Sequence, residues 1–132
     1  MKDQITAALD GLPVNSAFVY GSVARGTATA HSDLDTFILL NAAASETDLA
    51  RTRQRFISLQ RDLGFTPDDD YPVEIFTVAQ ARHAMTAEVH GGDISEDDVA
   101  EVLRALNEPK IVVLDSPDLR QLIALATRGR SQ

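Results

Sequence analysis

The sequence contains no cysteine. This absence excludes disulfides, thiolate metal sites and cysteine nucleophiles, and it fits a reducing compartment. The N-terminal stretch lacks the long apolar core of a secretory signal peptide. No apolar run approaches the roughly 18 residues that a membrane-spanning helix needs. We therefore expect a cytoplasmic protein that does not enter a membrane.

Positive charge is also scarce. The chain has 12 Lys and Arg against 20 Asp and Glu, which gives a formal net charge of −8. Because affinity for long nucleic acids comes largely from basic side chains that neutralise phosphates, this surface disfavours such ligands. A small anionic ligand is still compatible with it if metal ions supply positive charge locally. The length of 132 residues and the hydrophobic content of 44% predict one domain, 1–132, with a buried core.

Apolar periodicity predicts helices interleaved with strands. Helices are expected over residues 2–10, 47–63, 79–89, 96–107 and 117–128. Strands are expected over residues 17–20, 34–40, 73–78 and 111–114. This order predicts an α/β (α+β) fold, with a mixed sheet of about four strands flanked by helices. The connection between the first two strands is long for a hairpin loop, which indicates a functional role for it.

That connection follows a Gly-Ser pair. Residues 20–40 read YGSVARGTATAHSDLDTFILL. Gly21 allows the backbone to approach a ligand closely, and Ser22 adds a hydroxyl group. A helical turn that begins here would direct backbone N–H groups at phosphate, with Arg25 adding charge and Gly26 releasing the chain into the loop.

Two aspartates, Asp33 and Asp35, open the second apolar run. In a strand their side chains would point to the same face, where two carboxylates repel each other unless they are neutralised. A hard cation such as Mg²⁺ takes oxygen ligands and commonly binds substrate phosphates as well. Gly-Ser turns and Asp-x-Asp pairs are each common, so the interpretation depends on their occurring together at this spacing.

The combined pattern of GSVARG followed by SDLD resembles the nucleotidyltransferases of the DNA polymerase beta superfamily. More narrowly, it is similar to the small minimal nucleotidyltransferases. The resemblance implies a polymerase-beta-like fold with its core motif in residues 18–78 and with C-terminal helices and an edge strand in 79–128. It also implies that the following residues bind the nucleotide: Gly21, Ser22, Arg25 and Gly26.

The family needs a third carboxylate on the strand beside the Asp-x-Asp strand. Here VEIFTV supplies Glu74, and Asp70 in the preceding loop is a weaker substitute. The resemblance implies that Asp33, Asp35 and Glu74 are catalytic and bind two Mg²⁺ ions. The family usually has aspartate at the third position, whereas glutamate is one methylene longer. Two interpretations of Glu74 therefore stay open: a metal ligand, or a glutamate on an edge strand that faces water.

The implied activity is transfer of a nucleoside monophosphate, most readily AMP from ATP, to an acceptor hydroxyl. Minimal nucleotidyltransferases are often antitoxin partners of HEPN-domain toxins and can adenylylate them, so the resemblance implies a HEPN-domain partner. Two alternatives stay open. One is a catalytically inactive, antitoxin-like binding protein on the same fold. The other is a small-molecule nucleotidyltransferase, which would need an acceptor pocket formed as a homo-oligomer.

The remaining candidates point to no second site. The three histidines, His31, His83 and His90, lack metal-ligand spacing, although His31 lies in the loop before Asp33 and could contact phosphate. The acidic run 68–70 is expected to be a solvated loop. No Walker A, GxGxxG or GxSxG pattern is present.

Overall fold

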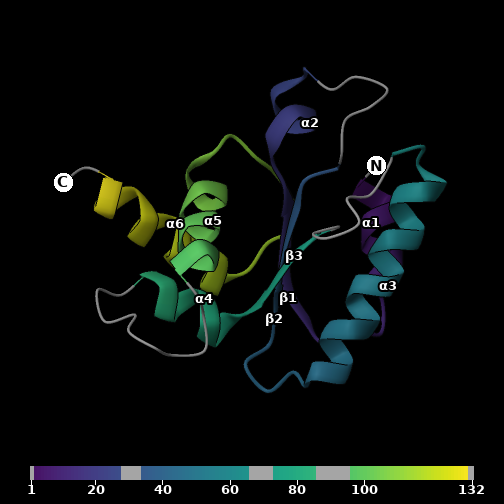
Figure 1. Ribbon diagram of the computed structural model, residues 1–132, viewed down its shortest axis with the longest axis horizontal. Helices are drawn as coiled ribbons and strands as arrows, with labels where there is room; N and C mark the ends of the chain where they lie inside the picture. The colour runs from purple at the N-terminus through teal and green to yellow at the C-terminus, as the bar shows by residue number, and fades with distance from the viewer. Residues whose placement is uncertain (1, 28–33, 66–72, 86–95, 131–132) are drawn as a thin grey trace.

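The computed structural model describes residues 2–27, 34–65, 73–85 and 96–130. Helices alternate with strands along this part of the chain (Figure 1). In chain order the elements are α1 (Lys2–Ala8), β1 (Val14–Val19), α2 (Gly21–Arg25), β2 (Thr36–Leu40), α3 (Glu46–Asp62), β3 (Glu74–Thr77), α4 (Val78–Met85), α5 (Glu96–Asn107), β4 (Ile111–Leu114) and α6 (Pro117–Arg130).

The strands form one mixed 4-stranded sheet in the order β3-β2-β1-β4. Strand β1 is antiparallel to both β2 and β4, whereas β2 and β3 are parallel. Helices α4, α5 and α6 lie on one face of the sheet, α1 and α3 lie on the other, and α2 projects from one end (Figure 1). The predicted mixed sheet flanked by helices is therefore confirmed, with the C-terminal strand at an edge as expected.

Each face of the sheet has its own hydrophobic core. On the side of α4, α5 and α6, the ring centroids of Phe18 and Phe37 are 5.1 Å apart, and those of Phe37 and Phe76 are 5.5 Å apart. This aromatic row crosses three strands. On the opposite side, Ile38 and Phe56 belong to the cluster beneath α1 and α3. Because side chains alternate along a strand, neighbouring residues of β2 supply both cores.

The boundaries of β1 and β2 differ from the sequence-based expectation. Strand β1 begins at Val14, three residues earlier than predicted, because polar side chains obscured its start. The Ser16 hydroxyl is buried but donates to Asn15, and the Asn15 amide donates to Asp118, so both polar groups are satisfied. The ladder between β1 and β2 ends at the pair Val19 and Thr36. Asp35 therefore lies just before β2, not within it.

The expectations for the helices agree more closely. Helix α3 begins after Ser45, which forms a capping box with Asp48. Phe56 and Leu59 are buried as predicted. The expected helix over 79–89 corresponds to α4, and residues 86–89 lie outside the described residues. Within the described ranges, no helix is long and apolar enough to cross a membrane.

Candidate active site

Helix α2 forms a single tight turn between two glycines. The backbone of Tyr20 is extended, and Gly21 then takes a φ of 70° in the left-handed region. Gly26 ends the turn with a φ of 75°, and the amide of Thr27 donates to the carbonyl of Ser22 at 2.9 Å. The helical turn predicted after the Gly-Ser pair is therefore confirmed. The left-handed φ at both ends explains why glycine occupies both positions.

The carboxylate of Asp35 lies directly against Gly21. A Cβ atom added to Gly21 would lie 2.2 Å from Asp35 Oδ2 and 3.0 Å from Cγ. The backbone amide of Tyr20 also donates to the Asp35 carbonyl at 2.9 Å. The start of α2 and this half-buried aspartate thus form one unit. Only a residue without a side chain leaves room for the carboxylate in this position.

Glu74 lies on the same face of the sheet and near the same end. It is the first residue of β3 and pairs in register with Phe37 of the parallel strand β2. Paired residues of adjacent strands share a face, and Asp35 lies two positions before Phe37. In agreement, the charges of Glu74 and Asp35 both contribute to raising the pKa of Tyr20. The structure therefore brings two of the predicted carboxylates to one neighbourhood.

Asp33, the third predicted carboxylate, lies outside the described residues, as do His31, Asp70 and His90. Among the residues that are described, no group of three acidic or histidine side chains is close enough to hold a metal ion. The predicted metal set includes Asp33, so it stays a prediction. His83 lies on α4 and is half-buried.

A buried tyrosine connects this neighbourhood to α5. The Tyr20 side chain is 2% exposed, and its hydroxyl donates to Glu101 Oε1 at 2.8 Å. Arg104 donates to both oxygens of the same carboxylate, with Nη2–Oε1 at 2.6 Å and Nε–Oε2 at 3.2 Å. Its guanidinium carbon also lies 5.4 Å from the Tyr20 ring centroid. Burial and the Glu101 carboxylate raise the pKa of Tyr20, so its hydroxyl stays a proton donor at neutral pH.

Arg25, predicted to contact phosphate, is found in an ion pair. Its Nη1 lies 2.7 Å from Glu108 Oε1, and Glu108 Oε2 accepts a hydrogen bond from Arg104 Nη1 at 2.9 Å. Sequence reasoning missed Glu101, Arg104 and Glu108. Their i,i+3 and i,i+4 spacing is that of ion pairs along a helix. That spacing could have indicated the pairs along α5 and the residue that follows it, but not their contact with α2.

The ion pair of Glu101 predicts a pH dependence of stability. Burial tends to raise the pKa of Glu101, but the hydrogen bonds from Arg104 and Tyr20 outweigh it, and the net pKa is lowered in the folded protein. Because the pKa of Glu101 is lower in the folded protein, its ionised form stabilises the fold at pH values above the pKa of the unfolded chain, near 4.5. This stabilisation is lost as the pH falls through the pKa of the folded protein. Glu101→Gln should therefore cost about 1 kcal/mol at pH 7 and progressively less below pH 4.5.

Urea unfolding at pH 7, 5, 4 and 3 measures this difference in the free energy of unfolding. Asp62→Asn, which removes an exposed carboxylate at the end of α3, is the control. A gap between wild type and Glu101→Gln that stays constant over this range would contradict the prediction.

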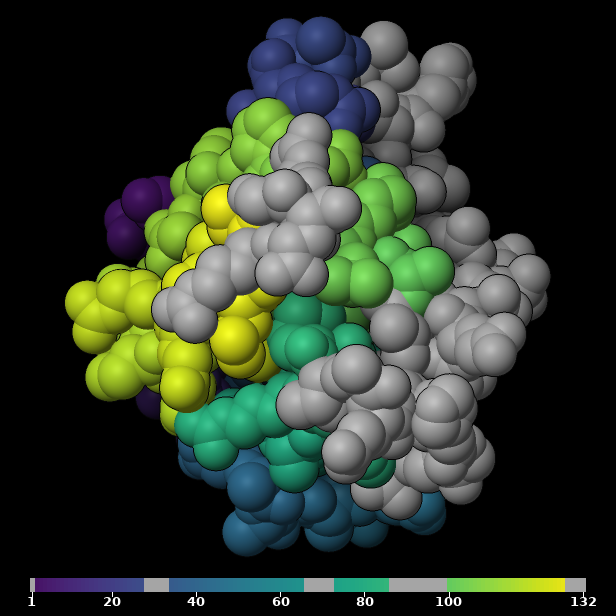
Figure 2. All heavy atoms as spheres, turned by 90° about the vertical axis from the view of Figure 1, so that its left-hand side faces the viewer, coloured from purple at the N-terminus to yellow at the C-terminus, as the bar shows by residue number. Residues whose placement is uncertain are grey.

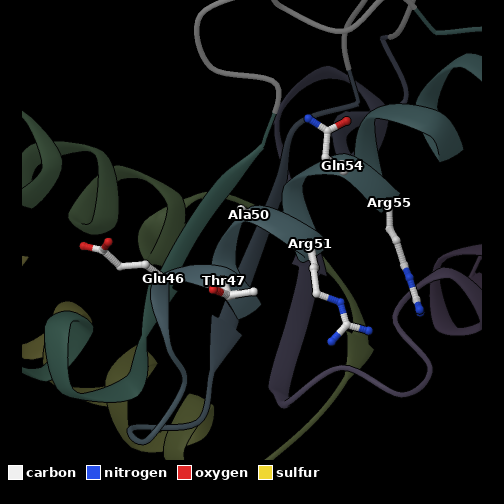
Figure 3. A pocket seen from close by; sticks show the side chains of 6 residues that line it. All are labelled: Glu46, Thr47, Ala50, Arg51, Gln54 and Arg55. Atoms are coloured by element: carbon white, nitrogen blue, oxygen red, sulfur yellow. The ribbon is translucent and has the colours of Figure 1, made fainter.

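A separate groove runs along α3 (Figure 3). Helix α3 and Tyr20 contribute to the hydrophobic cores on opposite faces of the sheet. It has a volume of about 560 Å³ and is lined by Glu46, Thr47, Ala50, Arg51, Gln54 and Arg55. Arg51 and Arg55 extend on the same side of the helix (Figure 3). Because one helix supplies all of these residues, the groove is a shallow surface feature, and none of the predicted site residues lines it.

Two solved structures of toxin–antitoxin assemblies share the fold of this chain. One is a toxin–antitoxin with AMP-PNP; it aligns with a TM-score of 0.58 and 13% sequence identity over 98% of this chain and 86% of that one. The other is a mutant of the toxin–antitoxin MntA-HpeT, with a TM-score of 0.58 and 11% identity over 99% and 87% of the two chains. At these identities the likeness establishes the fold.

The sequence comparison supports the same assignment. No curated protein matches the chain significantly. The family model described as a nucleotidyltransferase domain matches residues 2–90, which include α2, Asp35 and Glu74. Together with the shared fold, this match confirms the expected likeness to the nucleotidyltransferases. The chain belongs to the nucleotidyltransferase domain family.

Proposed function

We propose that this chain transfers a nucleoside monophosphate, most readily AMP from ATP, to an acceptor hydroxyl and releases pyrophosphate. The observation that supports this most directly is the contact between Gly21 and Asp35. It joins a turn whose first residue has no side chain to a carboxylate that could bind a cation. A nucleoside triphosphate needs these two features together, because its phosphates must be bound and their charge neutralised.

In this proposal the α2 turn binds the triphosphate. The backbone of Gly21 and the hydroxyl of Ser22 would hold the β- and γ-phosphates. Gly26 ends the turn, and Arg25 adds positive charge from its last residue. Since Arg25 is paired with Glu108, it would bind the phosphates only when that ion pair opens.

The predicted metal ligands fit Mg²⁺ by their chemistry. Asp33, Asp35 and Glu74 offer only carboxylate oxygens, which hard cations prefer. Because Gly21 has no side chain, the Asp35 carboxylate lies directly beside the turn, and a cation bound to Asp35 would be close to phosphates held there. Two Mg²⁺ ions, when bound, would lower the pKa of the acceptor hydroxyl and neutralise charge on the leaving pyrophosphate.

The carboxylate of Glu74 would take the proton from the acceptor hydroxyl. The acceptor oxygen then forms a bond to the α-phosphorus. The bond from this phosphorus to the bridging oxygen breaks, and that oxygen leaves with pyrophosphate. Asp33 and Asp35 would hold the triphosphate in line for this displacement through the bound cations.

We propose a protein as the acceptor, and specifically a HEPN-domain partner. Both similar structures are toxin–antitoxin assemblies, and one of them contains AMP-PNP, an ATP analogue. Co-purification of a HEPN-domain protein that gains the mass of one AMP with ATP and Mg²⁺ would support this acceptor. If neither appears, this choice of acceptor is wrong.

Thermal shifts with the four nucleoside triphosphates, each with and without Mg²⁺, test the proposed site. A triphosphate with Mg²⁺ at a hundredfold excess over its Kd should stabilise the wild type by about 2.7 kcal/mol. The double variant Asp33→Asn plus Asp35→Asn should lose this stabilisation, because two neutral amides bind the cation poorly. Asp62→Asn is the matched control and should keep it. Stabilisation that survives unchanged in the double variant would show that the site is wrong.

A further inference from the structure

Three charged side chains lie together at the C-terminal end of α5: Glu101 and Arg104 belong to the helix, and Glu108 follows it directly. Arg104 binds Glu101 at 2.6 Å and Glu108 at 2.9 Å, so a single guanidinium joins two carboxylates. Their side chains are only 26% and 21% exposed. In the view of Figure 2, α2 lies at the end of the molecule next to the segment that links α5 to β4. The C-terminal end of α5 therefore borders the turn for which phosphate binding is proposed.

Both ends of α2 are attached to this charged cluster. Tyr20, the residue before the turn, donates its hydroxyl to Glu101 at 2.8 Å. Arg25, the last residue of the turn, binds Glu108 at 2.7 Å. Arg104 links the two attachments into one continuous network. The five residues of α2 are thus held from both sides by α5 and the residue that follows it.

The turn depends on such attachments for its order. An isolated helix shorter than about 12 residues is marginal in water, because the first turn fixes several residues for few hydrogen bonds. Helix α2 has 5 residues and starts and ends at left-handed glycines. Its own hydrogen bonds therefore contribute little, and tertiary contacts decide its conformation. The paired charges also place two acidic side chains near the site at little electrostatic cost, since Arg104 compensates them.

We propose that Glu101 and Glu108 are positioning residues that hold Tyr20 and Arg25, and with them the α2 turn, in the geometry that receives nucleotide phosphates. They act through the turn and need not touch the nucleotide. The proposal rests on the function proposed above for Gly21 and Asp35.

Nucleotide affinity is the first test. ATP binding with Mg²⁺ is measured by titration calorimetry in Tyr20→Phe, Glu101→Gln and Glu108→Gln. Each variant should bind about three- to tenfold more weakly, as expected for the loss of one charge-assisted hydrogen bond that is partly screened by solvent. Tyr20 and Glu101 share one hydrogen bond. Their double variant should therefore lose little more affinity for ATP than the single variant that binds ATP more weakly. Arg120→Gln breaks a pair with Asp115 at 3.8 Å and is the matched control.

Hydrogen exchange without nucleotide is the second test. The amides of residues 22–26 should exchange faster in Tyr20→Phe and Glu108→Gln than in wild type, and by a larger factor than the amides of α3. A purely global loss of stability would accelerate both regions by the same factor. If these variants exchange their α2 amides at the wild-type rate and bind ATP with wild-type affinity, the proposal is wrong. In that case, loss of binding in the Asp33 and Asp35 double variant would still support the proposed function. If neither the wild type nor any variant binds ATP, the proposed function is wrong. If the α2 amides alone still exchange faster in the variants, the attachment of α2 to this cluster is nevertheless correct.

Discussion

Replacing Gly21 with alanine should abolish Mg²⁺-dependent ATP binding and lower the free energy of unfolding by about 2–4 kcal/mol. The new Cβ would lie 2.2 Å from Asp35 Oδ2, 3.0 Å from Cγ and 3.1 Å from Cβ. Either the aspartate or the turn must therefore move. The φ of 70° adds strain of its own for any residue with a side chain. Both changes disturb the contact that supports the proposed function. Urea unfolding and calorimetric titration with ATP measure the two effects.

Gly64→Ala is a matched control for this variant. Gly64 has a φ of 87°, but a Cβ atom there would meet no heavy atom within 4 Å. Its replacement should cost only the strain of a left-handed alanine, about 1 kcal/mol, with ATP binding unchanged. The difference between the two variants isolates the clash with Asp35. If both variants lose the same stability and both bind ATP, the close approach has no functional importance.

Replacing Glu74 with glutamine should reduce pyrophosphate release from ATP by about 10²- to 10⁴-fold. The amide keeps nearly the same shape, but it cannot accept the proton or bind a cation as a carboxylate does. Glu74→Asp should retain much more activity, because it keeps the charge and changes only the length. The rate is measured with labelled ATP in the presence of the partner protein. ATP affinity should change by less than the rate in both variants.

This comparison also decides between an enzyme and an inactive binding protein. Asp62→Asn is the control and should release pyrophosphate at the wild-type rate. A rate in Glu74→Gln equal to that of wild type would show that Glu74 is not the third carboxylate. If wild type binds ATP with Mg²⁺ but releases no pyrophosphate, the antitoxin-like binding protein is the correct interpretation of the glutamate at this position.

The sequence predicted those features that depend on local patterns. The turn after the Gly-Ser pair forms, and a strand forms within residues 73–78. The position of β3 beside β2 was implied by the family resemblance, and the register confirms it. Alternating apolar residues and glycine positions carry this information within a few residues of each feature. The predicted start of β2 is too early, because Asp35 precedes the ladder between β1 and β2. Its carbonyl nevertheless accepts a hydrogen bond from the Tyr20 amide.

The environment of Arg25 could not be predicted in the same way. Its side chain was expected near phosphate, yet it binds Glu108, which lies 83 residues away in the sequence. The choice between the two partners depends on how α5 packs against the sheet. That packing is set by buried residues such as Val102 and Leu106, whose periodicity predicts a buried face but not which segment lies opposite.

The attachment of α2 to α5 has a consequence for how the protein folds. The bond between Tyr20 and Glu101 spans 81 residues, and that between Arg25 and Glu108 spans 83. Contacts between distant parts of a chain must overcome the entropy of closing a long loop, so they form late. The Gly-Ser turn should therefore reach its final conformation only after α5 has docked. During synthesis, the nascent chain would contain the Gly-Ser turn and both aspartates well before α5 is available to hold that turn in place.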